Sequence, residues 1–559
     1  MSFVARGGSL NLAGAVVSGV LTFLFYVLVA RGLGKADVGA FFVATAVFTI
    51  VATSFQLGAH VGFVRFIPQH RVHDRRGDVL PMLAIGLVPV VALGAVAGMG
   101  MFFAAGWLAH VVSAGPAEDL VRRDLRAFSP FVPVLSAFTV VVAALQGMGS
   151  MRPSVTVDKL GRTGLQVLAG GVALAIGGSL AFVAAWAAPY LIGLVAGSLW
   201  LLRLVSRLGA TAGRPLTRPA SLAREFWKFS GPRGVASVFQ VLVLWLDTVL
   251  IAALSTTEQA GTYAVATRYL VVGTLAVGAL LQVFAPKVSE LFARGEMAAL
   301  SSVYQGSVAW LMALVWPVYV TIAVFSPTLL LLFGHRYTSA SGVLALLAAA
   351  MLFATACGPV DVVLLMAGRS WYSLCNWGLA LSVNVGIDVW LIPRHGMMGA
   401  AIGWSASILA RNFAALIEVW VLLRLHPVGP GFRRVVTFSL LCFGVLGGLI
   451  RLTLGTGPAA FLVASIVGSV GYALLLHRAR ATLKLDLLFA TLGTRLRRRP
   501  SGGRHRGPRR PRRHHLQREL VQPTTWPRFD RTAPQARAET PNGSSGVPLP
   551  SESVSGPRP

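Results

Sequence analysis

The sequence predicts an all-α integral membrane protein with about fourteen transmembrane helices, and three observations support this fold class. Hydrophobic residues make up 55% of the 559 residues and charged residues only 12%, whereas a soluble chain carries roughly 25% charged residues. Apolar runs of roughly 20 residues, the length that crosses a hydrocarbon core of about 30 Å, recur almost to residue 477. These runs lack the alternating pattern of barrel strands, and lipid offers backbone groups no hydrogen-bonding partner outside a helix.

The apolar runs follow one another along most of the chain. They begin near residues 10, 38, 79, 127, 159, 181, 234, 262, 306, 340, 372, 398, 433 and 458. The run after residue 159 is the most polar, because Lys159 and Arg162 lie at its start. The first run is too long for the apolar core of a secretory signal and is followed by Tyr26 and Arg31, so we expect it to remain as the first helix.

The distribution of basic residues predicts the orientation in the membrane. With the N-terminus in the cytoplasm, the inner segments before residue 478 carry about 21 Lys and Arg, and the outer loops about 8. Basic residues concentrate on the cytoplasmic side of membrane proteins. An even number of helices returns the C-terminus to the same side. The sequence therefore predicts a multi-pass protein of the cell membrane with both termini in the cytoplasm.

A repeat indicates how the helices are organised. The segment "VLVARGLGKADVGAFFVAT" (27–45) aligns without a gap on "VLIAALSTTEQAGTYAVAT" (249–267), at an offset of 222 residues. The match places the first two helices on the seventh and eighth, so the repeats have parallel topology. Two six-helix bundles around a central cavity, which rock against each other for alternating access, are typical of transporters.

The repeat predicts the domain boundaries. We expect an N-terminal six-helix bundle (1–202), a cytoplasmic linker (203–233), a C-terminal six-helix bundle (234–424), two additional helices (425–477) and a basic, mostly disordered cytoplasmic tail (478–559). The tail holds 18 Lys and Arg against 5 Asp and Glu. We expect it to lie on anionic lipid, at about 1 kcal/mol per basic residue near the surface; a regulatory contact is the alternative. Nucleic-acid binding is not expected, because no aromatic interleaving or folded module accompanies the charge.

Five elements, in order, resemble one family. They are "LVARGLGKADVGAF" (28–41), "FQLGAHVGFVRFIPQ" (55–69), "LWLDTVLIAALSTTEQAGTYAVATRY" (244–269), "FAPKVSELFARGE" (284–296) and "LSVNVGIDVWLIPRHGMMGAAIGWSAS" (381–407). This pattern is similar to the polysaccharide-export flippases, in the superfamily that also holds the MATE antiporters and the lipid II flippases. The resemblance implies translocation of an undecaprenyl-diphosphate-linked oligosaccharide to the outer leaflet. The basic tail departs from the family pattern and leaves a polysaccharide-assembly partner open.

Two charges distinguish the second repeat from the first. Asp247 and Arg268 stand where the first repeat has Phe25 and Ala46. A charge near the middle of the bilayer is unfavourable by at least about 2.5 kcal/mol, so it usually faces a cavity or a partner. Either Arg268 attracts a diphosphate that Asp247 orients, or the two form a structural ion pair. Arg31, at the end of the first helix, either receives a phosphate on exit or extends to the membrane surface.

A set of polar residues falls in the expected helices 10 to 12. Its members are Asp361, Asn376, Asn384, Asp388, Arg411, Asn412 and Glu418. Helical spacing puts Asn384 with Asp388, and Arg411 with Glu418, on common faces. One interpretation is a site for a coupling ion, H+ or Na+, at Asp361, Asn384, Asp388 and Glu418, with Arg411 contacting the substrate. The other is polar contact between helices. Asp361 follows Pro359, where a broken helix would expose backbone groups.

Other function classes fit the sequence less well. A cation-coupled multidrug or metabolite exporter of the same architecture is the main alternative. An enzyme that polymerises or ligates lipid-linked sugars would need a long outer loop with Arg and His, and the outer loops here are short. We expect no catalytic residue, metal or cofactor, because HExxH, Walker and GxSxG motifs are missing. Cys357, Cys375 and Cys442 lie in apolar runs without metal-like spacing, which favours packing.

Overall fold

Helices account for all the secondary structure in the described part of the chain. The computed structural model describes residues 2–479, apart from 73–74, 114, 116, 150 and 208–216. These residues belong to one unit, which spans residues 1–498. Twelve stretches among them are long and apolar enough to cross a membrane. Two further helical stretches, 151–176 and 257–294, lie between them, and the count of fourteen stays a prediction. The expected tail beyond residue 479 lies outside the described residues.

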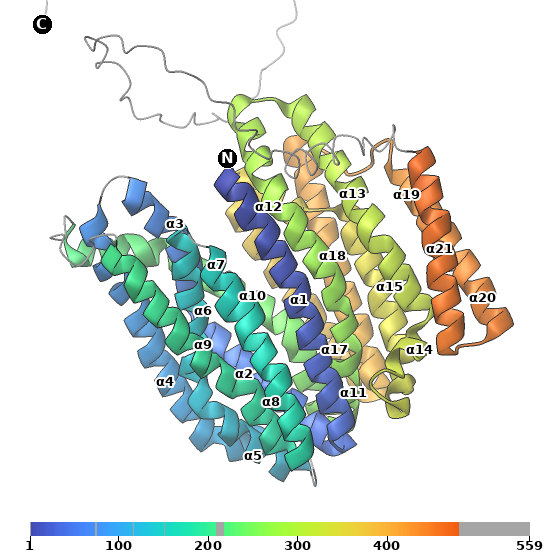
Figure 1. Cartoon of the computed structure of the whole chain (residues 1–559), viewed down its shortest axis with the longest axis horizontal. Coiled ribbons are helices and arrows are strands. Elements are labelled where there is room, and N and C mark those ends of the chain that lie inside the picture. The colour runs from blue at the N-terminus through green and yellow to red at the C-terminus, as the bar shows by residue number, and fades with distance from the viewer. Residues whose placement is uncertain are drawn as a thin grey trace, which may run out of the picture. The chain divides into compact units, whose positions relative to one another are not determined.

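The first half of the chain forms helices that run back and forth across the bundle (Figure 1). They are α1 (Ser2–Gly32), α2 (Lys35–Ser54), α3 (Ala59–Val72), α4 (Val79–Val112), α5 (Ala117–Phe128), α6 (Val132–Gly147), α7 (Met151–Pro153), the π-helical segment η3 (Ser154–Arg162), α8 (Thr163–Ile176) and α9 (Ser179–Arg207), with short 3-10 turns at η1 (Arg76–Asp78) and η2 (Ser129–Phe131). We call the end of the bundle where α1 begins the N-side.

The second half repeats this alternation. Its helices are α10 (Pro219–Leu254), α11 (Thr257–Thr267), η4 (Arg268–Leu270), α12 (Val271–Arg294), α13 (Met297–Val324), α14 (Ser326–Leu330), η5 (His335–Ala340), α15 (Ser341–Cys357), α16 (Val360–Met366), α17 (Ser370–His395), α18 (Met397–Leu423), α19 (Phe432–Ser439), the π-helical segment η6 (Leu440–Val445), α20 (Leu446–Leu454) and α21 (Pro458–Arg478). α21 ends on the N-side, where α1 begins (Figure 1).

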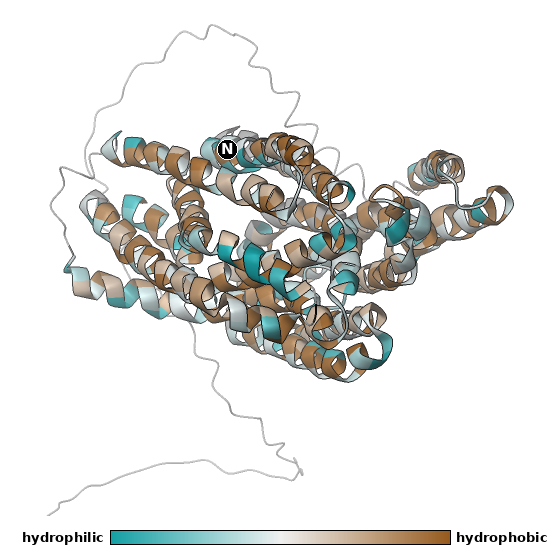
Figure 2. Ribbon diagram, turned by 90° about the horizontal axis from the view of Figure 1, so that it is seen from below, coloured by the Kyte–Doolittle hydropathy of each residue, from teal (hydrophilic) through white to brown (hydrophobic). Residues whose placement is uncertain are grey.

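Tryptophans on α17 are consistent with a membrane of ordinary thickness. Trp371 and Trp390 lie near the two ends of this helix and are 70% and 61% exposed. At a rise of 1.5 Å per residue they are about 28 Å apart along the axis, which matches a hydrocarbon core of about 30 Å. Tryptophan concentrates at both membrane surfaces. Apolar residues predominate along most of the helices (Figure 2).

α10 belongs to both halves of the molecule. It begins at Pro219, so residues 219–233 of the expected linker are helical. It packs against α2, α3 and α4 from the first half and against α11 and α17 from the second. Leu222 and Phe226, near its start, lie in a buried cluster with α3 and α4, whereas Val243 and Ile251 join the large central cluster. One continuous helix therefore ties the two halves together.

The helix that follows α1 is interrupted. α2 ends at Ser54 and α3 begins at Ala59, and between them Leu57 and Gly58 have positive φ angles of 52° and 72°. A Cβ on Gly58 would lie 2.2 Å from the Ser230 carbonyl oxygen of α10. Only glycine lets the two backbones approach this closely. Ser136 partly compensates for the break, because its hydroxyl donates to the Ala52 carbonyl oxygen at 2.7 Å.

Candidate substrate and ion sites

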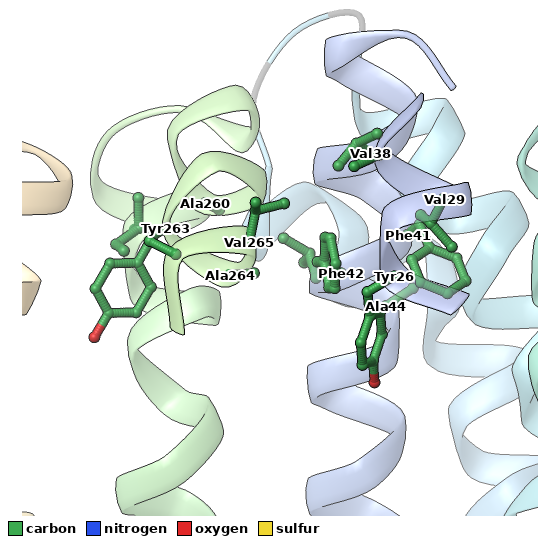
Figure 3. Packing of buried hydrophobic residues seen from close by; sticks show 14 of the residues in the cluster. Tyr26, Val29, Val38, Phe41, Phe42, Ala44, Ala260, Tyr263, Ala264 and Val265 are labelled. Atoms are coloured by element: carbon green, nitrogen blue, oxygen red, sulfur yellow. The ribbon is translucent and has the colours of Figure 1, made fainter. Parts of the chain in front are cut away.

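Arg268 lies among aromatic rings at the boundary between the two halves. It sits in the single turn η4, where α11 gives way to α12, and its Nε donates to the Ala264 carbonyl oxygen at 2.9 Å. The guanidinium carbon is 4.7 Å from the ring centre of Tyr26, 4.9 Å from that of Trp245 and 5.5 Å from that of Phe42. In Figure 3, Tyr26 and Phe42 lie close together, with Phe42 toward Val265 of α11. Ring faces attract the guanidinium and fix its plane.

Asp247 belongs to a different group of polar residues. Its Oδ2 accepts a hydrogen bond from the Tyr263 hydroxyl at 2.5 Å. Asn384 and Asp388 of α17 lie next to this carboxylate, and Asn384 Nδ2 donates to Asp388 Oδ2 at 3.2 Å. All four side chains are buried. Gly403 of α18 completes the enclosure, since a Cβ there would lie 1.9 Å from Asp388 Oδ1. We call Asp247, Tyr263, Asn384 and Asp388 the acidic cluster.

The acidic cluster has unused acceptor capacity. Asp247 Oδ1, Asn384 Oδ1 and Asp388 Oδ1 are buried and have no hydrogen-bond partner among the described residues. Two neighbouring carboxylates in a low-dielectric interior do not both stay ionised unless a cation binds between them. Without a cation, at least one of them takes up a proton. Carboxylate and amide oxygens are suitable ligands for a hard cation. No group of three His, Cys, Asp or Glu in the described ranges is placed to hold a metal ion.

The structure therefore separates the two charges that distinguish the second repeat. Asp247 is held by Tyr263, and Arg268 is held by the Ala264 carbonyl and three rings. Each has its own partners. This arrangement does not support the alternative in which the two form a structural ion pair.

The remaining polar residues of the expected helices 10 to 12 form a second group nearer the N-side. Arg411 Nη1 is 3.8 Å from Asp361 Oδ2, and its guanidinium carbon is 4.3 Å from the ring centre of Trp377. Asn376 Nδ2 donates to Glu418 Oε2 at 2.8 Å. The helix is broken beside Asp361, because α15 ends at Cys357 and α16 begins at Val360. The predicted polar set is thus divided, with Asn384 and Asp388 in the acidic cluster, whereas Asn412 donates to the Ile408 carbonyl oxygen of its own helix at 2.8 Å.

Arg31 has a structural partner at the end of the bundle opposite the N-side. Its Nε donates to the Leu332 carbonyl oxygen at 2.9 Å. Arg336 reaches in the other direction and donates to the carbonyl oxygens of Ala30 and, at 2.6 Å, Leu33. These bonds join the end of α1 to Leu332, which lies between α14 and η5, and to Arg336 of η5. The role of Arg31 as an exit contact for phosphate stays a prediction.

Arg162 is an ordered cation within the helices that hydropathy alone does not single out. Arg162 ends the π-helical segment η3, and its Nε donates to Asp158 Oδ1 at 2.8 Å. Its Nη1 donates to Gln166 Oε1 at 2.9 Å and to the Tyr190 hydroxyl at 3.3 Å. Its signal in the sequence is a pair of basic residues, Lys159 and Arg162, inside an apolar run, a pattern that also marks the start of a helix. π-helical segments inside α-helices occur frequently at functional sites.

Sequence comparison connects the chain with proteins of polysaccharide and glycan biosynthesis. Residues 4–292, more than half of the 559 residues, match the family described as polysaccharide biosynthesis protein. A probable low-salt glycan biosynthesis flippase, Agl15 of Haloferax volcanii, is 28% identical over 236 residues, which cover 40% of this chain. The matched region spans about half of that relative, 48% of its length.

Solved structures share the fold. The lipid II flippase MurJ, in an inward closed conformation, matches with a TM-score of 0.64 and 16% identity, over 85% of this chain and 99% of MurJ. An inward-facing multidrug resistance MATE transporter of the MOP superfamily matches with a TM-score of 0.60 and 14% identity, over 75% of this chain and 98% of that one. The chain therefore belongs to the polysaccharide biosynthesis protein family and has the fold of the MOP superfamily transporters.

Proposed function

We propose that this protein translocates an undecaprenyl-diphosphate-linked oligosaccharide across the cytoplasmic membrane for cell-surface polysaccharide biosynthesis, by alternating access of its two helix bundles. The observation that carries the proposal is Arg268, whose guanidinium is oriented by rings from α1, α2 and α10. The family match and the flippase names of Agl15 and MurJ support the same substrate class.

The chemistry of Arg268 suits a diphosphate. A diphosphate group that enters a low-dielectric interior needs a cation, because an unpaired charge there costs several kcal/mol. Arginine offers two parallel N–H donors, which match two phosphate oxygens. Nε of Arg268 is used by the Ala264 carbonyl, and the ring contacts fix the plane in which the terminal nitrogens point.

We propose that the acidic cluster binds the coupling ion, Na+ or H+. Its unpartnered buried oxygens on Asp247, Asn384 and Asp388 support this role. A bound cation would bring α10 and α17 together and so favour one arrangement of the C-terminal bundle. A separate polar group contains Asp361, Arg411 and Glu418. We propose that this group contacts the sugar of the substrate.

The orientation of the protein in the membrane and the role of its basic C-terminal segment are also proposals. α1 begins and α21 ends on the N-side (Figure 1), and the excess of basic residues there supports a cytoplasmic location for both termini. The basic segment beyond residue 479 would bind anionic lipid or a polysaccharide-assembly protein.

A reconstituted transport assay tests the proposed function. Purified protein would be placed in liposomes with a fluorescent undecaprenyl-diphosphate-linked sugar, and its appearance in the opposite leaflet measured by a membrane-impermeant quencher. We expect protein-dependent movement that Arg268→Gln abolishes and Arg122→Gln leaves unchanged, because Arg122 lies at the surface with Asp119. Export of cationic dyes without movement of the lipid would instead establish the multidrug alternative. Arg268 already opposes that alternative, since its positive charge repels a cationic cargo.

A further inference from the structure

The helix that carries Arg268 changes its winding at that residue. α11 ends at Thr267, η4 covers Arg268–Leu270 as a 3-10 turn, and α12 begins at Val271. A 3-10 helix has about three residues per turn against about 3.6 in an α-helix, so each of its residues rotates by about 20° more. Over the length of η4 this adds about 60° between the faces of α11 and α12. The direction of the Arg268 side chain therefore depends on the winding of η4.

The guanidinium of Arg268 is anchored in the preceding helix. Its Nε donates to the Ala264 carbonyl oxygen at 2.9 Å, and the Thr267 hydroxyl donates to the same oxygen at 2.8 Å. The guanidinium is thus fixed to α11, whereas the Cα of Arg268 belongs to η4. If η4 relaxed into regular α-helix, the Cα would rotate relative to the Ala264 carbonyl, and the plane of the guanidinium would change.

Tyr319 of α13 holds the start of α12. Its hydroxyl donates to the Leu270 carbonyl oxygen at 2.9 Å, and its side chain is fully buried. The backbone N–H of Gly273, the third residue of α12, lies within reach of the same hydroxyl oxygen. A capping side chain usually satisfies this N–H, but Leu270, at the capping position, makes no such bond. Tyr319 therefore supplies from a neighbouring helix the cap that α12 lacks.

Glycine at position 273 leaves room for this hydroxyl. A Cβ there would lie 2.1 Å from the Tyr319 hydroxyl oxygen. A larger residue would therefore push the hydroxyl away from the Leu270 carbonyl oxygen. Lipid offers a backbone group no replacement partner, so loss of this bond would favour a different winding of η4.

η4 is held on a second side by its own tyrosine. The Tyr269 hydroxyl donates to the Leu329 carbonyl oxygen of α14. The ring centre of Tyr269 is 5.1 Å from that of Phe23 on α1 and 5.7 Å from that of Phe333, both in edge-to-face contact, a favourable arrangement for aromatic pairs. Tyr269 thus fixes a side chain of η4, whereas Tyr319 fixes its backbone.

We propose that Tyr319 is a positioning residue for the cargo, because its bond to Leu270 keeps η4 in the winding that aims the Arg268 guanidinium. This inference rests on the proposed function, in which Arg268 binds the diphosphate. The Tyr319 hydroxyl is used within the protein and its side chain is fully buried, so it acts on the cargo through Arg268. Its effect is on how tightly the lipid binds.

Binding of undecaprenyl diphosphate, without sugar, to the purified full-length protein tests this assignment. Tyr319→Phe removes only the hydroxyl, and we expect the dissociation constant to rise by about three- to ten-fold, as loss of one hydrogen bond of ordinary strength does. Tyr304→Phe is the matched control, because Tyr304 lies on the same helix, is fully buried and donates to the Cys357 carbonyl oxygen at 2.7 Å. Both variants should lower the melting temperature, but only Tyr319→Phe should weaken binding.

Lysine at position 268 separates positioning from general damage. An ammonium group is not planar and needs no aimed plane, so Tyr319→Phe should cost little further affinity when combined with Arg268→Lys. A tyrosine with a purely structural role would weaken binding by the same factor in both backgrounds. That result, wild-type binding by Tyr319→Phe, or an equal loss of binding in Tyr304→Phe would overturn the inference.

Gly273→Ala tests the same contact from the other side. We expect it to weaken binding as Tyr319→Phe does, whereas Gly278→Ala, with open space around its Cβ position, should bind like the wild type. If Tyr319→Phe does not fold, Gly273→Ala decides, and wild-type binding by that variant refutes the inference. Failure of both variants to fold would assign the contact to stability and refute it as well. Failure of the wild type to bind the lipid, or unchanged binding in Arg268→Gln, would instead refute the proposed function.

Discussion

Gly39 and Gly261 pack directly against each other where α2 crosses α11. A Cβ on Gly261 would lie 2.8 Å from the Gly39 Cα, and a Cβ on Gly39 would lie 2.2 Å from the Thr257 carbonyl oxygen. The two glycines are equivalent in the repeat, at the offset of 222 residues. Contact between equivalent residues is what a twofold relation between two halves produces. The Ser113 and Thr257 hydroxyls, 2.7 Å apart, add a polar contact at the same place.

This crossing predicts how alanine affects transport. Gly261→Ala cannot be accommodated without separating α2 from α11, so we expect the end of the bundle opposite the N-side to open and transport to fall by at least about ten-fold. Reactivity of a cysteine at Thr262 toward a membrane-impermeant maleimide, in a background without the native cysteines, would report the opening. Gly278→Ala is the matched control, because nothing lies within 4 Å of its Cβ position. Unchanged labelling in Gly261→Ala would show that the crossing does not close the bundle.

The bonds between the end of α1 and Arg336 of η5 predict a loss of stability when they are removed. Arg336→Ala removes the donors to the Ala30 and Leu33 carbonyl oxygens, and we expect unfolding free energy to fall by about 1–3 kcal/mol. Thermal denaturation in detergent would measure the change. Arg394→Ala provides the comparison, since Arg394 is exposed and donates only to Trp390 of its own helix among the described contacts. Equal melting temperatures for both variants would contradict this expectation.

The enclosure of Asp388 predicts an effect of Gly403. Gly403→Ala should push the Asp388 carboxylate out of place, because the new Cβ would lie 1.9 Å from its Oδ1. We expect the ion dependence of transport to disappear in Gly403→Ala and in Asp388→Asn alike. Transport rates with and without a Na+ or proton gradient would show this. Gly386→Ala, with open space around its Cβ position, should retain the dependence. An unchanged gradient response in Asp388→Asn would exclude the cluster as the coupling site.

The separate partners of Asp247 and Arg268 predict that their substitutions do not compensate. Arg268→Ala should abolish transport in a folded protein, and Arg268→Lys should retain part of it, because lysine keeps the charge but not the bidentate geometry. Adding Asp247→Ala to Arg268→Ala should restore nothing. Expression and lipid export would be measured for each variant, and recovery in the double variant would show an ion pair between them after all.

The sequence predicted the helices and singled out several candidate site residues, because a charge within an apolar run is a strong signal in a membrane protein. Asp247 and Arg268 were found because they are charges in apolar runs. Their partners could not be predicted, since Tyr263, Tyr26 and Phe42 reach them through helix crossings that hydropathy does not encode. Spacing placed Asn384 and Asp388 together, and they do form a hydrogen bond. Spacing did not indicate that α10 brings Asp247 beside them.

There is also a physical reason why the environment of Arg162 could not be predicted from the sequence. Its position looked like the start of a helix because polar residues usually mark helix ends. The structure continues the helix through it as the π-helical segment η3. Extra residues per turn change which side chains share a face, so the 3.6-residue periodicity used for the other helices fails there. The break at Leu57 and Gly58 could not be predicted from hydropathy, because the apolar run continues through it.

The continuity of α10 means that the two halves are not autonomous folding units. If the polypeptide were divided within residues 208–216, the first fragment would lose the partners of Phe63 and Phe66, because Phe226 packs against both rings from the second fragment. The second fragment would expose Leu222 and Phe226, which are buried in the intact chain. Neither piece would be stable alone, and both would have to be synthesised together and assemble in the bilayer to regain activity.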